Sequence, residues 1–197
     1  MTYRHILVKD QGARVAEITP MPDSLPPRWA AAVQPPPATW GPGPDAPLFA
    51  PPIPFVVPPA DRYGECFYPH NHCPSIAWLP NGDMLAVWFS TIREEGVEMT
   101  ILASRLRAGS TSWDPAAEFF NAENRNMTGS SIFYDEATGV LHHINGMGLR
   151  DTEGWGDLVM VHRCSQDNGV SWSAACPVSP GGRYQRRNQP IAGMVRA

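Results

Sequence analysis

The chain has 197 residues with 15 basic and 19 acidic side chains, which gives a net charge of −4. Proteins that bind nucleic acid usually present a basic face, so this balance argues against a nucleic-acid partner. No run approaches the roughly 18 apolar residues that a membrane span needs, and residues 1–20 lack the apolar core of a secretion signal. We therefore expect a cytoplasmic protein with no membrane segment.

A proline-rich segment opens the chain. Of the 22 prolines, 15 lie between Pro20 and Pro59. Because proline lacks an amide hydrogen and fixes φ, this segment is not expected to form a helix or a central strand. We predict an extended arm or linker over residues 1–62 and a folded domain over residues 63–197.

Two similar hairpins follow the arm. Residues 74–90 contain two alternating apolar runs around Asn81-Gly82, a sequence that favours a tight turn between strands. Residues 130–146 repeat this pattern, with the turn expected between Glu136 and Gly139.

Each predicted hairpin is followed by a third apolar run, at residues 98–105 and at residues 157–164. A turn and a tryptophan come next, and these tryptophans, Trp113 and Trp172, are 59 residues apart. Units of four short strands at such a period predict the blades of a β-propeller. We expect blade one at about 66–120, blade two at about 121–180 and the start of blade three at about 181–197.

The most informative turn is "SQDNGVSW", residues 165–172. Asp167 can accept hydrogen bonds from amides of its own turn, Gly169 can supply a positive φ, and Trp172 can pack beneath the turn. The pattern of Ser165, Asp167, Gly169 and Trp172 resembles the Asp-box of the sialidase superfamily, also called the bacterial neuraminidase repeat. The first unit carries a related stretch, "SRLRAGSTSW" (104–113), without the aspartate.

The resemblance extends to "LPNGDMLA" in the first hairpin and to "RRNQPI" near the end of the chain. It implies an all-β, six-bladed sialidase-like propeller. Closing six blades takes on the order of 340 residues, so we expect a partial chain, or self-association if the chain is complete.

Strands of a blade alternate in direction, so the loops between second and third strands lie at the same end as the connections between blades. The resemblance places the active site at this end. Arginines with interspersed carboxylates suit an anionic sugar, because a guanidinium pairs with its carboxylate and a carboxyl group works as acid or base. The candidate binding residues are Arg93, Arg125, Arg150 and Arg187.

The resemblance implies three arginines for the substrate carboxylate, an aspartate acid/base, and a tyrosine nucleophile assisted by a glutamate. Here His72, in "HCP", stands where the family has the arginine of an Arg-Ile-Pro motif. Arg93 lies in the loop that holds the second arginine and the acid/base, and Tyr184 does not match the nucleophile. The candidate catalytic residues are therefore Glu94, Glu95 and His72.

These candidates favour a sialidase-like glycoside hydrolase of the exo-α-sialidase type, acting on an anionic glycan. A non-catalytic carbohydrate-binding propeller and a uronic-acid polysaccharide lyase are the alternatives. In the lyase, His72 or Tyr184 would abstract a proton while an arginine neutralises the carboxylate.

A group of possible metal ligands lies in "CFYPHNHC", where His70 and His72 share one face of a strand. The spacing of these histidines from Cys66 and Cys73 fits no common zinc site. We predict neither a metal nor a cofactor.

Overall fold

The computed structural model describes residues 28–30, 53, 67–149, 151, 154–178, 190 and 193–194. These residues form two antiparallel four-stranded sheets, and their single helical element is one 3-10 turn, η1 (Arg28–Ala30). The all-β prediction is confirmed. The described residues contain no long apolar helix of the kind that crosses a membrane. Most of the predicted start of blade three and most of the proline-rich arm lie outside the described residues.

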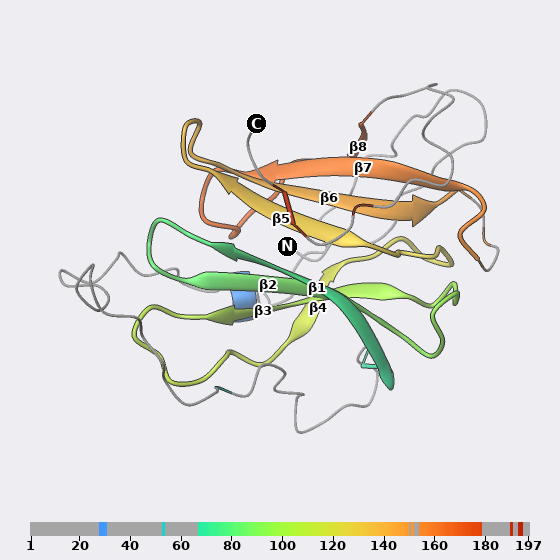
Figure 1. The fold of residues 1–197 in the computed structure, drawn as a ribbon, viewed down its shortest axis with the longest axis horizontal. Coiled ribbons are helices and arrows are strands. Elements are labelled where there is room, and N and C mark those ends of the chain that lie inside the picture. Colours follow the sequence, from blue (N-terminus) through green and yellow to red (C-terminus); the bar gives the residue numbers. More distant parts are fainter. Residues whose placement is uncertain are drawn as a thin grey trace, which may run out of the picture.

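Each sheet is a simple meander in which every strand pairs with the next one along the chain (Figure 1). Sheet one has the order β1-β2-β3-β4, with the strands β1 (His70–Trp78), β2 (Met84–Thr91), β3 (Thr100–Leu106) and β4 (Ala117–Phe120). Sheet two has the order β5-β6-β7-β8, with the strands β5 (Ser130–Asp135), β6 (Val140–Gly148), β7 (Leu158–Ser165) and β8 (Cys176–Pro177).

Both predicted hairpin turns are present between the first two strands of each sheet. Gly82 has φ 88° and donates its amide to the carbonyl of Leu79, while Gly139 has φ 70° and donates to the carbonyl of Asp135. Positive φ is accessible to glycine at little cost, which is why these two positions close the turns.

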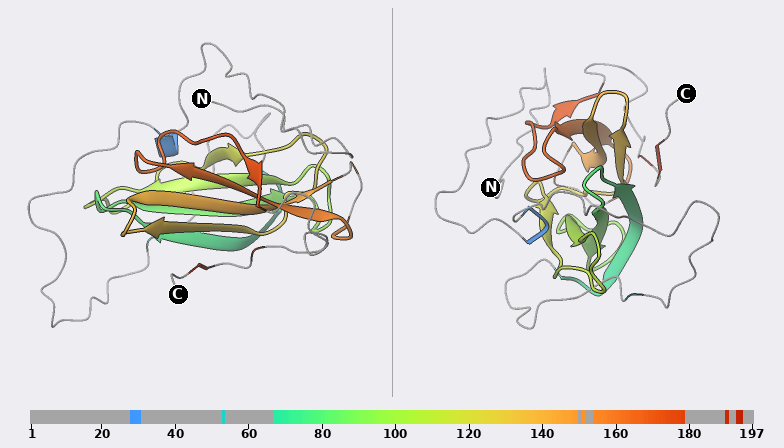
Figure 2. Two further views of the ribbon diagram at one scale, coloured as in Figure 1. Left: turned by 90° about the horizontal axis from the view of Figure 1, so that it is seen from above. Right: turned by 90° about the vertical axis from the view of Figure 1, so that its left-hand side faces the viewer.

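The main core lies between the two sheets. Leu85, Val87 and Phe89 on β2 alternate with Ala86 and Trp88, which belong to a second cluster on the opposite face of sheet one. The sheets lie one over the other, with the antiparallel strands of both sheets running roughly along the same axis (Figure 2). Their first strands are joined by a hydrogen bond of 3.0 Å from the amide of Ile132 to Ser75 Oγ.

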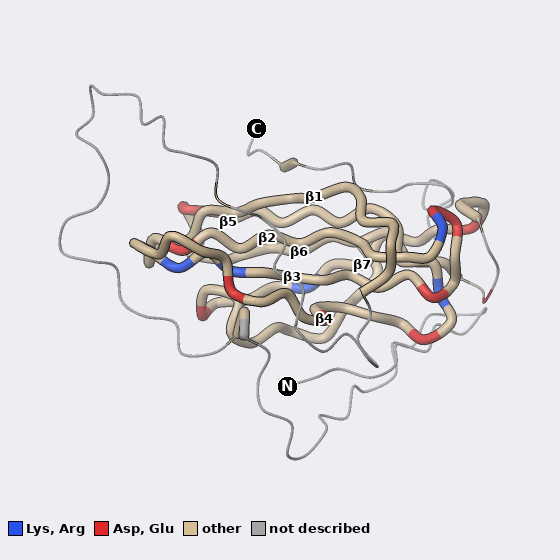
Figure 3. The backbone as a smooth tube through the Cα atoms, turned by 90° about the horizontal axis from the view of Figure 1, so that it is seen from below, with Lys and Arg blue, Asp and Glu red and all other residues tan. Residues whose placement is uncertain are grey.

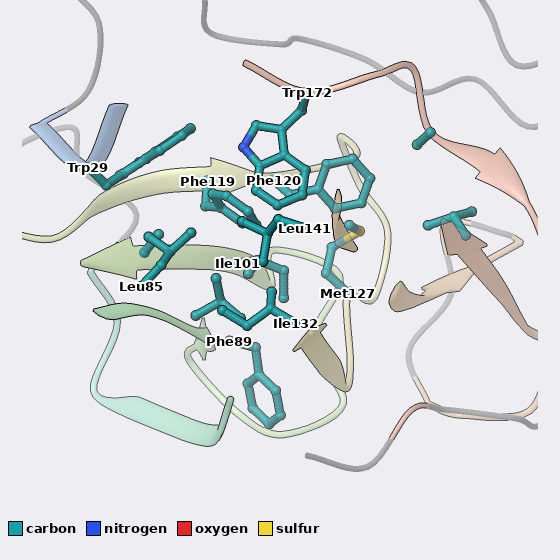
Figure 4. Packing of buried hydrophobic residues seen from close by; sticks show 14 of the residues in the cluster. Trp29, Leu85, Phe89, Ile101, Phe119, Phe120, Met127, Ile132, Leu141 and Trp172 are labelled. Carbon is teal, nitrogen blue, oxygen red and sulfur yellow. The ribbon is translucent and has the colours of Figure 1, made fainter. Parts of the chain in front are cut away.

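Aromatic side chains dominate one side of this core (Figure 4). The ring of Phe119 packs edge-on against Trp29 at 5.0 Å and against Trp172 at 5.1 Å. Such edge-to-face pairs stabilise by about 0.5–1.5 kcal/mol beyond the area they bury. The proline-rich segment thus supplies Trp29 to the main core, and Ile53 packs against the second cluster.

Candidate functional site

The antiparallel order of the strands brings three connections to one end of the sheets, which we call the site end. These are the β2–β3 loop (92–99), the β4–β5 connection (121–129) and the β6–β7 loop (149–157). The amide of Gly154 donates to the carbonyl of Glu95 at 3.1 Å, which joins the two loops. Acidic positions lie in the loops at both ends of the strands, as Figure 3 shows.

One contact joins two of the predicted catalytic residues, His72 and Glu94. His72 Nδ1 lies 3.5 Å from Glu94 Oε1, and the side chains are 53% and 45% exposed. His72 comes from β1 and Glu94 from the β2–β3 loop, so the antiparallel pairing of β1 with β2 creates the contact. Both residues were predicted from the sequence as catalytic candidates.

His70 completes the cluster from the same strand. The rings of His70 and His72 lie edge to face with centroids 5.5 Å apart, and both contact Phe89. His70 Nε2 is buried and has no hydrogen-bond partner among the described residues. His70 was not among the predicted site residues, although its spacing of two from His72 on a strand indicated a shared face.

A β-bulge shapes the strand next to this cluster. The register of β1 against β2 shifts between His72 and Ser75, and Cys73 has a left-handed φ of 51°. Bulges are common beside functional sites because they redirect side chains. Burial raises the pKa of the Cys73 thiol, and the negative charge of Glu94 raises it further.

The β2–β3 loop is held in shape by Glu98. Its Oε1 accepts hydrogen bonds of 2.8 Å from Thr91 Oγ1 and from the amide of Ile92. Burial raises the pKa of Glu98, but hydrogen bonds from its own backbone amide, from Thr91 and from Ile92 outweigh burial, so the pKa is lowered overall. The amide of Gly96 closes the loop by donating to the carbonyl of Arg93 at 2.9 Å.

The other predicted catalytic and substrate-binding residues fall into two groups. Arg93, Glu95 and Arg125 lie at the site end, the first two exposed and Arg125 half-buried. Arg150 and Arg187 lie outside the described residues, so a clamp of several arginines stays a prediction.

The "SQDNGVSW" turn lies at the opposite end of the sheets. Asp167 Oδ1 accepts a hydrogen bond of 2.7 Å from Ser165 Oγ and one of 2.9 Å from the amide of Ser171. Trp172 Nε1 donates to the carbonyl of Gly169. Burial raises the pKa of Asp167, but the hydrogen bonds from Ser171 and Ser165 lower it overall. The side chains of Ser165, Asp167 and Trp172 thus hold the turn itself.

A buried polar network between the sheets was not foreseen from the sequence. Arg163 Nε donates to His143 Nδ1 at 3.0 Å, and His143 Nε2 lies 2.6 Å from Ser130 Oγ. The guanidinium also stacks on Phe119 at 4.2 Å from the ring centroid. Burial lowers the pKa of His143 well below its ordinary value, and the charge of Arg163 lowers it further. All three polar residues are inaccessible, so this network belongs to the core.

Comparison with solved structures identifies the fold. The NanB sialidase of Streptococcus pneumoniae superposes with a TM-score of 0.51 at 9% identity, over 71% of this chain and 40% of the sialidase. A family 117 glycoside hydrolase of Zobellia galactanivorans gives a TM-score of 0.46 at 11% identity, over 60% of this chain and 42% of its own. This chain therefore spans about two fifths of the length of these proteins.

The sequence itself matches the family of BNR repeat-like domains over residues 82–197, more than half of its length. No curated protein sequence is significantly similar to it. The predicted resemblance to the sialidase superfamily and the propeller fold are confirmed by the family match and by the likeness to NanB. The chain belongs to the family of BNR repeat-like domains.

Proposed function

We propose that this chain is part of a carbohydrate-active β-propeller, and more narrowly of a sialidase-like glycoside hydrolase that acts on an anionic glycan. The observation that carries the proposal is the contact between His72 and Glu94, next to Arg93 at the site end. NanB, which shares the fold at a TM-score of 0.51, is a sialidase. This likeness is why a glycosidase is preferred to a binding module.

The chemistry needs one cation and one carboxyl group near the glycosidic bond. Arg93 supplies a permanently charged guanidinium that can pair with a sugar carboxylate. Glu94 and Glu95 supply carboxyl groups, one of which protonates the leaving oxygen. His72 lies against Glu94, so its imidazole can hydrogen-bond to that carboxylate or to the substrate.

The test is a turnover assay with a fluorogenic α-sialoside and with a panel of uronic-acid polysaccharides. Glu94→Gln, Glu95→Gln and the double variant keep the size of the side chain but remove its acidity. We expect the double variant to lose about 10²–10⁴-fold in kcat, because general acid–base catalysis contributes roughly this factor. Sugar affinity should change little in the same variant.

Glu136→Gln is the matched control, because this exposed glutamate lies in the β5–β6 turn at the opposite end. Release of an unsaturated, ultraviolet-absorbing product would identify a lyase instead. Saturable binding of an anionic glycan without turnover would identify a carbohydrate-binding propeller. Unchanged turnover in the double variant would refute the proposed roles of the two glutamates.

A further inference from the structure

We propose that His70, His72 and Glu94 form a binding site for a divalent transition-metal ion, with Zn²⁺ as the best fit. One ligand atom from each of the three side chains lies within 4.8 Å of the ligand atoms of the other two. Two of the side chains come from β1 and the third from the β2–β3 loop, so the fold assembles the group from separate segments. This inference does not depend on the proposed glycosidase activity.

The spacing of the ligand atoms is close to that of a coordination sphere. Zinc binds imidazole nitrogen and carboxylate oxygen at about 2.0–2.2 Å in a tetrahedral arrangement, which places neighbouring ligand atoms about 3.3–3.5 Å apart. The distance from His72 Nδ1 to Glu94 Oε1 is 3.5 Å. Because both side chains are about half exposed, they can rotate to bring the three groups around one ion.

An ion pair between His72 and Glu94 would account for the positions of these two side chains but not for that of His70. His70 remains, with a buried Nε2 that has no hydrogen-bond partner in the described part of the chain. A buried polar atom without a partner costs about 1–3 kcal/mol. A role for the His70 ring as a metal ligand would account for the retention of a polar side chain at this position.

The rings of His70 and His72 both pack against Phe89. Phe89 stacks on His70 with an interplanar angle of 13° and contacts His72 edge-on. The bulge between His72 and Ser75 fixes the backbone beside them. An apolar side chain in this position limits the access of water to the two rings from that side.

The donor set also indicates the kind of site. Two imidazoles and one carboxylate are a set found in catalytic zinc centres, where three protein ligands leave a position open for water or substrate. No metal was predicted from the sequence, because the spacing of the two histidines from Cys66 and Cys73 fits no common zinc site. Glu94, which is 22 residues after His72, takes their place. If Glu94 binds the ion, Glu95 is left as the proton donor of the proposed hydrolase.

The test is a calorimetric titration of the chelator-treated full chain with Zn²⁺, without any sugar present. We expect saturable binding of one ion per chain. His72→Ala and Glu94→Gln should each weaken binding at least about 100-fold, because loss of a ligand should exceed the 10–100-fold cost of losing a second-shell partner. Both side chains are exposed enough for the variants to keep the fold, which circular dichroism would verify.

Glu95→Gln and His162→Ala are the matched controls. Glu95 is the neighbouring carboxylate, and His162 belongs to a second histidine pair in which Nε2 lies 2.9 Å from His142 Nδ1. Both variants should bind Zn²⁺ as the unaltered chain does. The proposal is overturned if the chain binds no Zn²⁺, if His72→Ala and Glu94→Gln bind it unchanged, or if His162→Ala abolishes binding. Failure of the glycosidase assay would leave this titration unaffected.

A spectroscopic titration with Co²⁺ gives an independent readout. Visible bands of bound Co²⁺ should appear in the unaltered chain and be lost in His72→Ala. The spectrum should lack sulfur-to-metal charge transfer, since the proposed ligands are nitrogen and oxygen. A strong charge-transfer band would assign the ion to a cysteine and refute the proposed ligand set.

Discussion

The turn between the third and fourth strands is built differently in the two sheets. In sheet two, Asp167 lies within the turn and accepts the amide of Ser171 at 2.9 Å. In sheet one the turn has no such aspartate. Its Ala108 amide donates at 2.9 Å to Asp83, which comes from the neighbouring β1–β2 hairpin, and Arg107 pairs with Asp114 at 2.9 Å.

The two turns share a buried tryptophan and one backbone hydrogen bond to the third strand. Trp113 and Trp172 are both buried beneath their turns. The residue after each tryptophan donates its amide at 2.8 Å to a carbonyl of the third strand, Asp114 to Arg105 and Ser173 to Cys164. The buried indole and this hydrogen bond are therefore the common requirement, while the carboxylate can come from elsewhere in the fold.

The two turns are also joined by one buried side chain. Arg105 Nη1 pairs with Asp83 at 3.0 Å, and Arg105 Nη2 donates to the carbonyl of Asn168 at 2.6 Å. Its Nε donates to the carbonyl of Trp29 at 2.6 Å. The Arg105 side chain is completely buried, and these three partners give each of its nitrogens one hydrogen bond.

Loss of Arg105 should have the largest effect. Arg105→Met keeps most of the side-chain volume but leaves Asp83 buried without its counter-ion, which typically costs about 3–5 kcal/mol. We expect the free energy of unfolding in urea to fall by about this amount. Adding Asp83→Asn should recover part of the loss. If the free energy of unfolding fell by less than about 1 kcal/mol, the buried pair of Arg105 and Asp83 would not stabilise the contact between the two turns.

Glycine replacement separates backbone strain from packing in the same two turns. Gly169 has φ 80°, and an added Cβ would lie 3.1 Å from Leu85 Cδ2, whereas Gly109 has φ 75° and open space around it. Gly109→Ala should cost about 1–2 kcal/mol from the left-handed conformation alone. Gly169→Ala should cost about 1–3 kcal/mol more, because overpacking adds to the strain. If thermal unfolding showed equal losses of stability for Gly109→Ala and Gly169→Ala, the proposed overpacking of an added Cβ against Leu85 would be contradicted.

Removing the turn carboxylate should give a smaller and pH-dependent effect. Asp167→Asn weakens the hydrogen bonds from Ser165 and Ser171, and we expect a loss of about 1 kcal/mol at pH 7. Because folding lowers the pKa of Asp167, its stabilisation is present above the unfolded pKa, near 3.9, and is lost as pH falls through the folded value. The unfolding curves of the two proteins should therefore converge in acid. If the difference in stability between the unaltered chain and Asp167→Asn stayed constant down to the lowest pH, ionisation of Asp167 would be excluded as its cause.

The ion pair of sheet one should matter least. The side chains of Arg107 and Asp114 are 25% and 20% exposed. Arg107→Gln should cost about 0.5 kcal/mol or less, and about 1 M salt should remove most of the difference. A loss as large as that of Asp167→Asn would show that the ion pair replaces the missing aspartate more fully than its exposure suggests.

The repeated strands could be predicted because their signals are local. Alternating apolar residues and the turns at Gly82 and Gly139 specify each hairpin without reference to the rest of the chain. The same holds for the turn around Asp167, whose hydrogen-bond partners lie within four residues.

The remaining features depend on partners that are distant in sequence. The contact of His72 with Glu94 depends on the register of β1 against β2 and on the bulge at Cys73. Neither the register nor the bulge can be predicted from the hydrophobic pattern of the sequence. From the sequence, Arg105 is expected to be an exposed polar residue of an alternating strand. In the structure its side chain is completely buried between the sheets, opposite Leu85. The packing of Trp29 on Phe119 likewise connects residues that a linear reading assigns to separate segments.

The three partners of Arg105 have a consequence for the order of events during synthesis. Trp29 precedes Arg105 by 76 residues and Asn168 follows it by 63. When sheet one leaves the ribosome, the guanidinium still lacks the carbonyl that sheet two provides. Sheet one therefore cannot complete the hydrogen bonding of Arg105 until residue 168 has been synthesised.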